Sequence, residues 1–124
     1  MIMRLFRFDA SAGHPITHFD SVGLVMSPIQ RGEGQFQIGC MHLEAGGLVG
    51  FHQAVGPQLF LVVRGEGWVR GERPERHSIA VGQAAFWTDG EWHESGTATG
   101  MDAIVLEAAT LDPTQFLPEM PMEA

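Results

Sequence analysis

Short apolar segments separated by glycine, proline, serine and aspartate recur along the whole chain. No stretch of about a dozen residues keeps apolar side chains at i, i+3, i+4 and i+7 without a glycine, so the pattern does not predict an amphipathic helix. Short apolar runs between turn residues are instead typical of β-strands. The pattern predicts strands at 5–8, 22–26, 35–43, 48–51, 59–63, 67–69, 78–81, 84–87 and 103–107. Strands at this spacing, joined by glycine-rich turns, predict an all-β antiparallel sandwich or barrel.

The segment 59–63 reads Leu-Phe-Leu-Val-Val and is apolar at every position. A strand with apolar side chains on both faces is buried on both, so it lies in the centre of the protein or under a second subunit. The sequence Arg-Gly-Glu-Gly at 64–67 follows directly. It predicts a tight turn, and therefore a hairpin from this strand into the next one at 67–69.

The two ends of the chain carry weaker patterns. We expect strands within 1–33 to extend a sheet. The proline-containing tail, 112–124, is either a frayed end or an arm laid over a neighbouring surface. Because the apolar strand at 59–63 and the Met- and Phe-bearing tail both need cover, the sequence predicts a homodimer.

Composition and charge narrow the class of protein. With 124 residues, of which 44% are hydrophobic, the chain predicts a single domain, 1–124, with a proper core. The formal net charge of −8 leaves no cationic surface for nucleic acid or an acidic membrane. Cys40 is the only cysteine, which excludes an internal disulfide and favours a reducing compartment. The N-terminal apolar run is too short for a signal peptide, and no run approaches the roughly 20 residues of a membrane span, so we expect a cytoplasmic protein.

Two sets of residues in the middle of the chain follow a fixed spacing. The first set is Gly46, His52, Ala54, Gln58 and Gly65, and the second is Gly82, Thr88, Gly90, His93 and Thr97. Their intervals resemble the two sequence motifs of the cupin superfamily. The resemblance covers about 34–107 and implies a double-stranded β-helix, a jelly-roll-like antiparallel barrel, with this segment as its core.

The resemblance also implies a metal site. In cupins two histidines and a glutamate of the first motif bind a divalent ion together with the histidine of the second motif. The corresponding ligands here are His52, Gln58 and His93, for an ion such as Fe, Mn, Ni, Co or Zn. Ala54 occupies the place of the remaining histidine and cannot ligate, and Gln58 offers a neutral carbonyl in place of a carboxylate. Glu91 is a candidate to support His93 or to replace the missing ligand. The alternative is a vestigial site whose histidines only form hydrogen bonds inside the barrel.

Aromatic residues close to these ligands predict a lined pocket. Phe60, Trp87 and Trp92, with Glu91, are the expected pocket residues, and the cupin frame places Ala85 and Trp87 inward and Phe86 outward. Apolar walls with a few polar groups are typical of small-ligand sites, so we expect a small, partly apolar organic ligand. Core packing is the alternative explanation of the same aromatic residues.

Other candidate residues indicate less. Cys40, His42 and Glu44 share one face of a strand, but residues two apart are poorly placed for a nucleophile–base pair. His14, His18 and His77 lie in turn-rich segments and are expected to be exposed.

Three functional hypotheses remain open. These are a metal-dependent enzyme of dioxygenase or isomerase type, a metal-free binding or sensing module, and a structural subunit whose own side chains fill the pocket.

Overall fold

The structure, a computed structural model, describes residues 2–122 and is built almost entirely from β-strands. Two short 3₁₀ turns, η1 (Ala10–Ala12) and η2 (His18–Asp20), interrupt them. No helix in the described range is long and apolar enough to cross a membrane. The strands are β1 (Arg4–Arg7), β2 (His14–Ile16), β3 (Leu24–Met26), β4 (Gln37–Leu43), β5 (Leu48–Gln53), β6 (Gln58–Arg70), β7 (His77–Ala80), β8 (Gln83–Trp87), β9 (Trp92–Gly96), β10 (Met101–Glu107) and β11 (Glu119–Met120).

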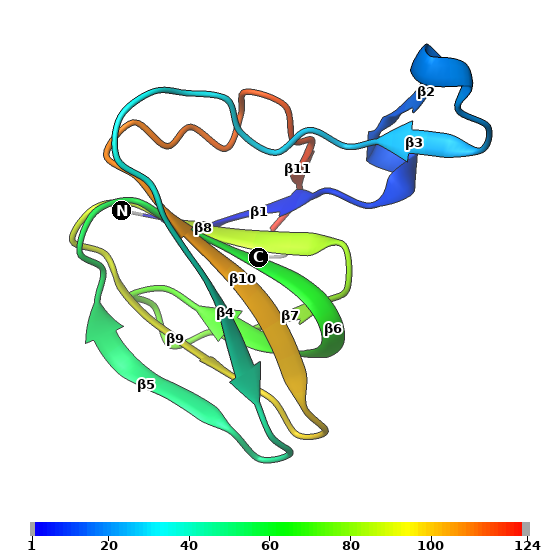
Figure 1. Ribbon diagram of the computed structural model, residues 1–124. Helices are drawn as coiled ribbons and strands as arrows, with labels where there is room; N and C mark the ends of the chain where they lie inside the picture. The colour runs from blue at the N-terminus through cyan, green and yellow to red at the C-terminus, as the bar shows by residue number, and fades with distance from the viewer. Residues whose placement is uncertain (1, 123–124) are drawn as a thin grey trace.

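Two antiparallel sheets form the body of the protein and share one long strand (Figure 1). The first sheet has the order β11-β1-β8-β6-β10-β4. In the second sheet β6 pairs with β7 and β9, and β9 pairs in turn with β5. Since β6 takes part in both sheets, the two sheets face one another and enclose a barrel.

The hairpin predicted at 64–67 is wrong, because β6 runs through this segment without reversing. The strand bends there instead. Its pairing with β10 shifts register next to Val62, and Gly65 has φ +77°, a left-handed conformation that glycine adopts without strain. The first half of β6 thus lies in one sheet and the second half in the other. The same glycine-rich sequence that suits a turn also suits a sharply bent strand.

The core lies in two layers, one inside the barrel and one outside it. The inner layer joins residues of both sheets, such as Phe60, Val69, Ile79, Trp87 and Val105. The outer layer covers the other face of the first sheet. Ala85 and Trp87 belong to the inner layer and Phe86 to the outer one, as the cupin frame predicted.

The strand segment at 59–63 is central, and the same chain covers the outer face of its first part, whereas Val63 at its end is 45% exposed. Leu59 and Leu61 pack in one cluster with Ala108, Leu111 and Leu117, which follow β10. The tail therefore lies over its own sheet, where β11 pairs with β1; residues 123–124 of the predicted tail fall outside the described range. Leu59, Leu61 and the tail therefore find cover within one chain, and Val63 does not.

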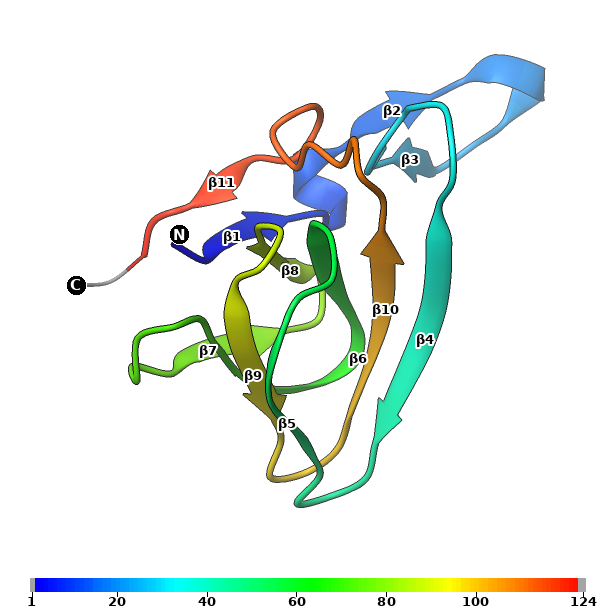
Figure 2. The same cartoon turned by 90° about the vertical axis from the view of Figure 1, so that its left-hand side faces the viewer.

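The N-terminal strands behave in two ways. β1 extends the first sheet beside β8, as expected. β2 and β3 do not, because they pair only with each other and form a two-stranded arm that projects from the body (Figures 1 and 2).

Candidate functional site

A row of polar side chains crosses the first sheet at one end of the barrel. The register pairs Gln37 with Glu107, Glu107 with Gln58, and Gln58 with Trp87, across β4, β10, β6 and β8. Residues directly opposite each other in a sheet share a face, and Trp87 belongs to the inner layer. The four side chains therefore lie side by side on the inner face, and we call the three polar ones, Gln37, Glu107 and Gln58, the polar row.

Two histidines stand on the opposite sheet. His52 of β5 is paired directly with His93 of β9, and their ring centroids are 4.3 Å apart. The ring of His93 also stacks on Trp87, with centroids 4.2 Å apart and planes 25° apart. Trp87 thus connects the histidine pair to the polar row. His93 is 3% exposed, whereas His52 is open to solvent and forms the accessible side of the site.

Hydrogen bonds to the backbone determine which ring nitrogen of each histidine remains available to a ligand. Nδ1 of His52 lies 2.6 Å from the carbonyl oxygen of Gly50, and Nδ1 of His93 lies 3.2 Å from that of Glu91. Because a carbonyl oxygen only accepts, each Nδ1 donates in this contact, which leaves Nε2 as the ring nitrogen available to a ligand. Metal-binding histidines are typically oriented in this way.

The pKa of His93 is lowered by burial, and the neighbouring His52 acts in the same direction. The carbonyl of Glu91 and the carboxylate of Glu107 offset only part of this effect. His93 is therefore neutral near pH 7 and keeps its free Nε2 below the usual imidazole pKa of about 6.5. A neutral imidazole can accept a proton, bind a metal ion or accept a hydrogen bond from a ligand.

Glu107 supplies the carboxylate that the first cupin motif lacks. Its Oε1 accepts a hydrogen bond of 2.7 Å from Nε2 of Gln58, which leaves Oε1 of Gln58 available for another partner. Sequence reasoning missed Glu107 and Gln37 because both lie outside the two motifs. The available signal was the alternation of Ala103, Val105 and Glu107 along one strand, which places all three on the inner face.

A hollow of about 910 Å³ opens beside the polar row. Gln37 and Glu107 belong to the polar row and also line the hollow. The apolar side chains of Phe36, Val55 and Pro57 line it as well. Glu33 and Asp89 add two more carboxylates, so the hollow is acidic. None of the described residues that line it is cationic.

None of the four expected pocket residues lines this hollow. Phe60 and Trp87, 2% and 1% exposed, pack edge to face and fill the barrel next to the polar row. Trp92 lies on the outer face, stacked on Phe51, because the strand that points His93 inward points its neighbours outward. The carboxylate of Glu91 turns away from the histidines and accepts hydrogen bonds from the backbone and hydroxyl of Thr88.

The remaining candidate residues are not part of this site. Cys40 is exposed, and His42 contacts Asp102 at 3.1 Å on the outer face of the first sheet. His14 and His18 belong to the projecting arm, and His77 begins β7.

The residues fit a metal ion only in part. Within residues 2–122, no three His, Cys, Asp or Glu side chains are grouped closely enough to hold one. His52 and His93 provide two oriented nitrogen donors, and Oε1 of Gln58 would be the third, neutral donor. Buried Trp87 Nε1, on the ring that stacks on His93, donates to no described protein group.

Glu91 gives a prediction about pH. Its carboxyl is fully buried, and burial raises its pKa. The folded protein therefore favours the protonated form. The protonated carboxyl therefore contributes to the stability of the folded protein. This contribution is complete below the pKa of about 4.3 in the unfolded chain, and it is lost as pH rises through the pKa in the folded protein. Glu91→Gln should melt increasingly above the wild type as pH rises from 4.5 to 8, since the amide oxygen can keep both contacts with Thr88. Thermal melts across this range measure the difference.

The matched control is Glu75→Gln, which neutralises an exposed carboxylate. Its melting temperature should follow that of the wild type at every pH. A difference between Glu91→Gln and wild type that stays constant with pH would contradict the assignment.

Comparisons with known proteins agree with this architecture. No family model matches the sequence, and no curated protein does. Solved structures do match. A cupin superfamily protein of Desulfitobacterium hafniense is 14% identical with a TM-score of 0.56, over 68% of this chain and 77% of that one. A cupin-like protein of Thermotoga maritima is 19% identical with a TM-score of 0.56, over 60% and 58% of the two chains. A predicted oxalate decarboxylase of Thermotoga maritima is 25% identical with a TM-score of 0.50, over 56% and 62%.

The fold is therefore the cupin β-barrel, and the fold that the two spaced motifs implied is confirmed. The chain is a small protein with this barrel, in which the histidine pair and the polar row occupy one end.

Proposed function

We propose that the protein binds a small molecule at this end of the barrel through His52, His93, Gln58 and Glu107. One observation carries the proposal: two imidazoles, each fixed through Nδ1, leave their Nε2 atoms available to a ligand beside a carboxylate–amide pair. Glu107 lines the open hollow of about 910 Å³. Free acceptor groups beside a hollow of this kind are typical of a binding site rather than of a packed core.

The same groups define the chemistry of the ligand. The imidazole Nε2 atoms and the Glu107 carboxylate all accept hydrogen bonds, and Glu33 and Asp89 surround the approach with negative charge. They favour a ligand that donates hydrogen bonds and is neutral or cationic, such as a polyol or an amine. Phe36, Val55 and Pro57 suit a short apolar part. A dicarboxylate is disfavoured by this charge, although one structural neighbour is a predicted oxalate decarboxylase.

A second candidate is a metal-dependent enzyme of dioxygenase or isomerase type. The backbone-fixed imidazoles favour it, because this is how proteins orient histidine ligands. His52, His93 and Oε1 of Gln58 would hold the ion, which would act as a Lewis acid toward a ligand oxygen. Glu107 would orient Gln58 through their hydrogen bond and would accept a proton from the bound molecule. Phe60 and Trp87 would keep water out of the inner side of the site.

The test measures binding directly. Thermal shift against polyols, amines and the chloride salts of Mn, Co, Ni and Zn, followed by calorimetry, should find at least one class that binds wild-type protein. His52→Ala should weaken that binding about tenfold or more, because it removes a donor without opening the core. His77→Ala is the matched control and should bind as wild type does.

The outcomes separate the two candidates. Binding of polyols or amines without added metal supports the metal-free module, and binding that requires a metal ion supports the enzyme. If no compound or ion binds, or if His52→Ala binds as tightly as wild type, the barrel end is only a filled core.

A further inference from the structure

The arm made by β2 and β3 has no partner within the described chain. Its two strands have three residues each, and such a short isolated hairpin is at best marginally stable in water. It nevertheless carries large apolar side chains in the open. Phe19 is 98% exposed, Val22 95% and Met26 51%. An arm of this composition gains stability only when another surface covers it.

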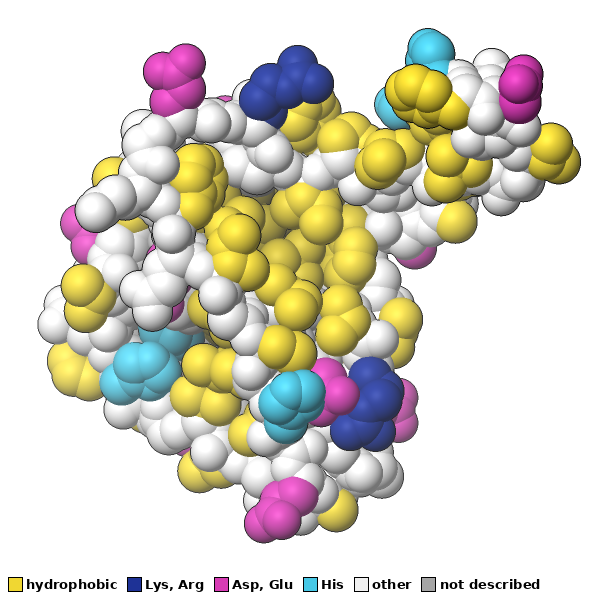
Figure 3. Space-filling view, viewed as in Figure 1, with side chains coloured by type: hydrophobic (Ala, Val, Ile, Leu, Met, Phe, Trp, Pro, Cys, Tyr) yellow, Lys and Arg dark blue, Asp and Glu magenta, His cyan; other side chains and the backbone are white. Residues whose placement is uncertain are grey.

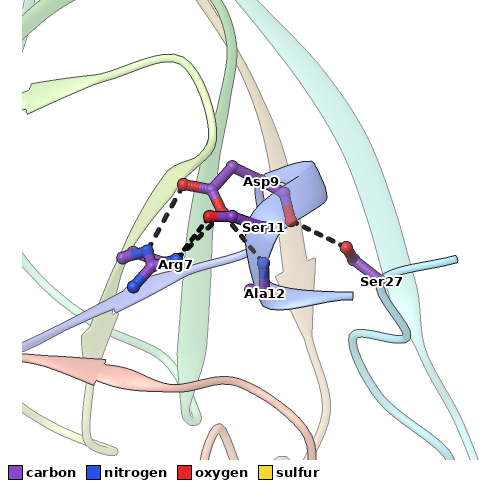
Figure 4. A network of polar contacts seen from close by, with 5 residues as sticks. All are labelled: Arg7, Asp9, Ser11, Ala12 and Ser27. Atoms are coloured by element: carbon purple, nitrogen blue, oxygen red, sulfur yellow. Dashed lines mark hydrogen bonds and ion pairs between the residues drawn. The ribbon is translucent and has the colours of Figure 1, made fainter. Parts of the chain in front are cut away.

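The base of the arm is held firmly. Asp9 accepts hydrogen bonds from the guanidinium of Arg7, the hydroxyl of Ser11 and the backbone N–H of Ala12, and its own carbonyl accepts one from Ser27 (Figure 4). This network joins the chain entering the arm to the chain leaving it. The arm therefore projects in a fixed direction from β1 and is not a loose tail.

The body carries a complementary apolar surface. On the outer face of the first sheet, Ile38 is 67% exposed and Val63 45%, with Cys40 exposed and Ile104 half-buried between them. Cys40 pairs with Ile104 across β4 and β10, and Ile104 with Leu61 across β10 and β6, so they share this face. Figure 3 shows hydrophobic side chains gathered across it, below the arm. We call this surface the β4 face. Among the described strands, β4 is also the last of its sheet, and its outer edge is unpaired.

We propose that the arm of one copy covers the β4 face of a second copy, and that the second arm covers the first face in return. Both uncovered surfaces occur in every chain, and a two-fold axis satisfies both with a single kind of contact. In this arrangement each copy buries both surfaces at once, including Ile38 and the two most exposed large apolar side chains of the described residues, Phe19 and Val22.

Charge favours this pairing over other contacts between copies. The chain has a net charge of −8, so most surfaces of two copies repel each other. The arm carries Asp20 as its one acidic residue, and the β4 face is bordered by Arg64, whose charge is balanced by Asp102 at 2.6 Å. Two copies can therefore meet here without bringing an excess of like charges together. The proposal is independent of any ligand in the barrel.

Sedimentation equilibrium of the purified chain tests the stoichiometry. Wild type should have twice the mass of one chain at micromolar concentration. Val22→Asp in the arm and Ile38→Asp on the face should each be monomeric, because each places a charge in an apolar contact. Leu48→Asp, a comparably exposed apolar residue on β5, is the matched control and should remain dimeric. Since all three side chains are exposed, circular dichroism should show the same fold.

A mixing experiment tests the reciprocal geometry. A Val22→Asp chain keeps an intact face, and an Ile38→Asp chain keeps an intact arm, so the mixture restores one of the two contacts. Heterodimers should form where neither variant dimerises alone. A dimer held by face against face or arm against arm would not be restored by mixing.

Cys40 supplies a readout besides mass, since it lies in the β4 face and is the only thiol. Its reaction with a disulfide reagent should be several-fold slower in wild type than in Val22→Asp. A monomeric wild type, or equal thiol reactivity in both proteins, would overturn the proposal.

Discussion

Replacing Gly65 with alanine is expected to destabilise the protein by about 3 kcal/mol or more, a large share of the about 5–15 kcal/mol of a typical domain. Two causes add. Gly65 has φ +77°, where an L-residue pays a steric penalty of roughly 1–2 kcal/mol. A β-carbon at this position would also collide with the carbonyl oxygen of Gly100, which is backbone and cannot rotate away. Denaturant unfolding followed by circular dichroism measures the loss.

Gly46→Ala separates the two causes. Gly46 has φ +79°, but a β-carbon there meets no atom within 4 Å. It should therefore cost only the conformational penalty of roughly 1–2 kcal/mol. If the two variants lose equal stability, the close approach of β6 to Gly100 does not limit the fold, and our account of the bend is wrong.

This bend marks the limit of what local sequence can predict about the fold. The strand positions and the barrel could be predicted, because apolar runs alternate with turn residues and because two motifs keep their spacing. The path at 64–67 could not, since Arg-Gly-Glu-Gly has the composition of a tight turn. What keeps the strand extended is its pairing on both sides, with β10 before Gly65 and with β7 and β9 after it. Those contacts come from residues far away in the chain.

The candidate site, too, could be predicted only in part: residues inside the two motifs could be assigned from the sequence, and residues outside them could not. The motif spacing identified His52, Gln58 and His93, and the structure brings the two histidines together as a directly paired couple. Glu107 could not be assigned to the site in this way, because its position beside Gln58 depends on the register between two distant strands. The position of Trp92 was within reach of the sequence. Neighbouring residues in a strand point to opposite faces, so an inward His93 requires an outward Trp92.

Replacing Ala54 with histidine is expected to tighten the binding of a divalent metal ion by an order of magnitude or more. Ala54 lies two residues after His52 and so points to the same side of the chain. Its backbone N–H donates to the carbonyl oxygen of Glu91, so the strand-like pairing continues beyond β5. A third imidazole would then join His52 and His93 and give the three protein ligands that an open metal site needs. Calorimetry with Zn²⁺, Co²⁺ and Ni²⁺ measures the affinity.

Gln53→His provides the control for this variant. It adds an imidazole one residue earlier, on the opposite face of the strand, where Gln53 is exposed. It should leave metal affinity unchanged, so a gain in Gln53→His equal to that in Ala54→His would show that any added histidine suffices.

Thermal melts of Ala54→His decide between two states of the barrel end. Ala54 is 5% exposed, so the new ring must displace water or press on neighbouring side chains. If the site lacks only one ligand, the metal-bound variant melts above the metal-bound wild type, because tight binding to the folded state stabilises it. If Phe60 and Trp87 have taken the space, the ring overpacks the barrel and costs about 1–3 kcal/mol with or without metal. The 4.3 Å separation of the two ring centroids favours the first outcome, because a third imidazole there completes a site that two oriented ligands already begin.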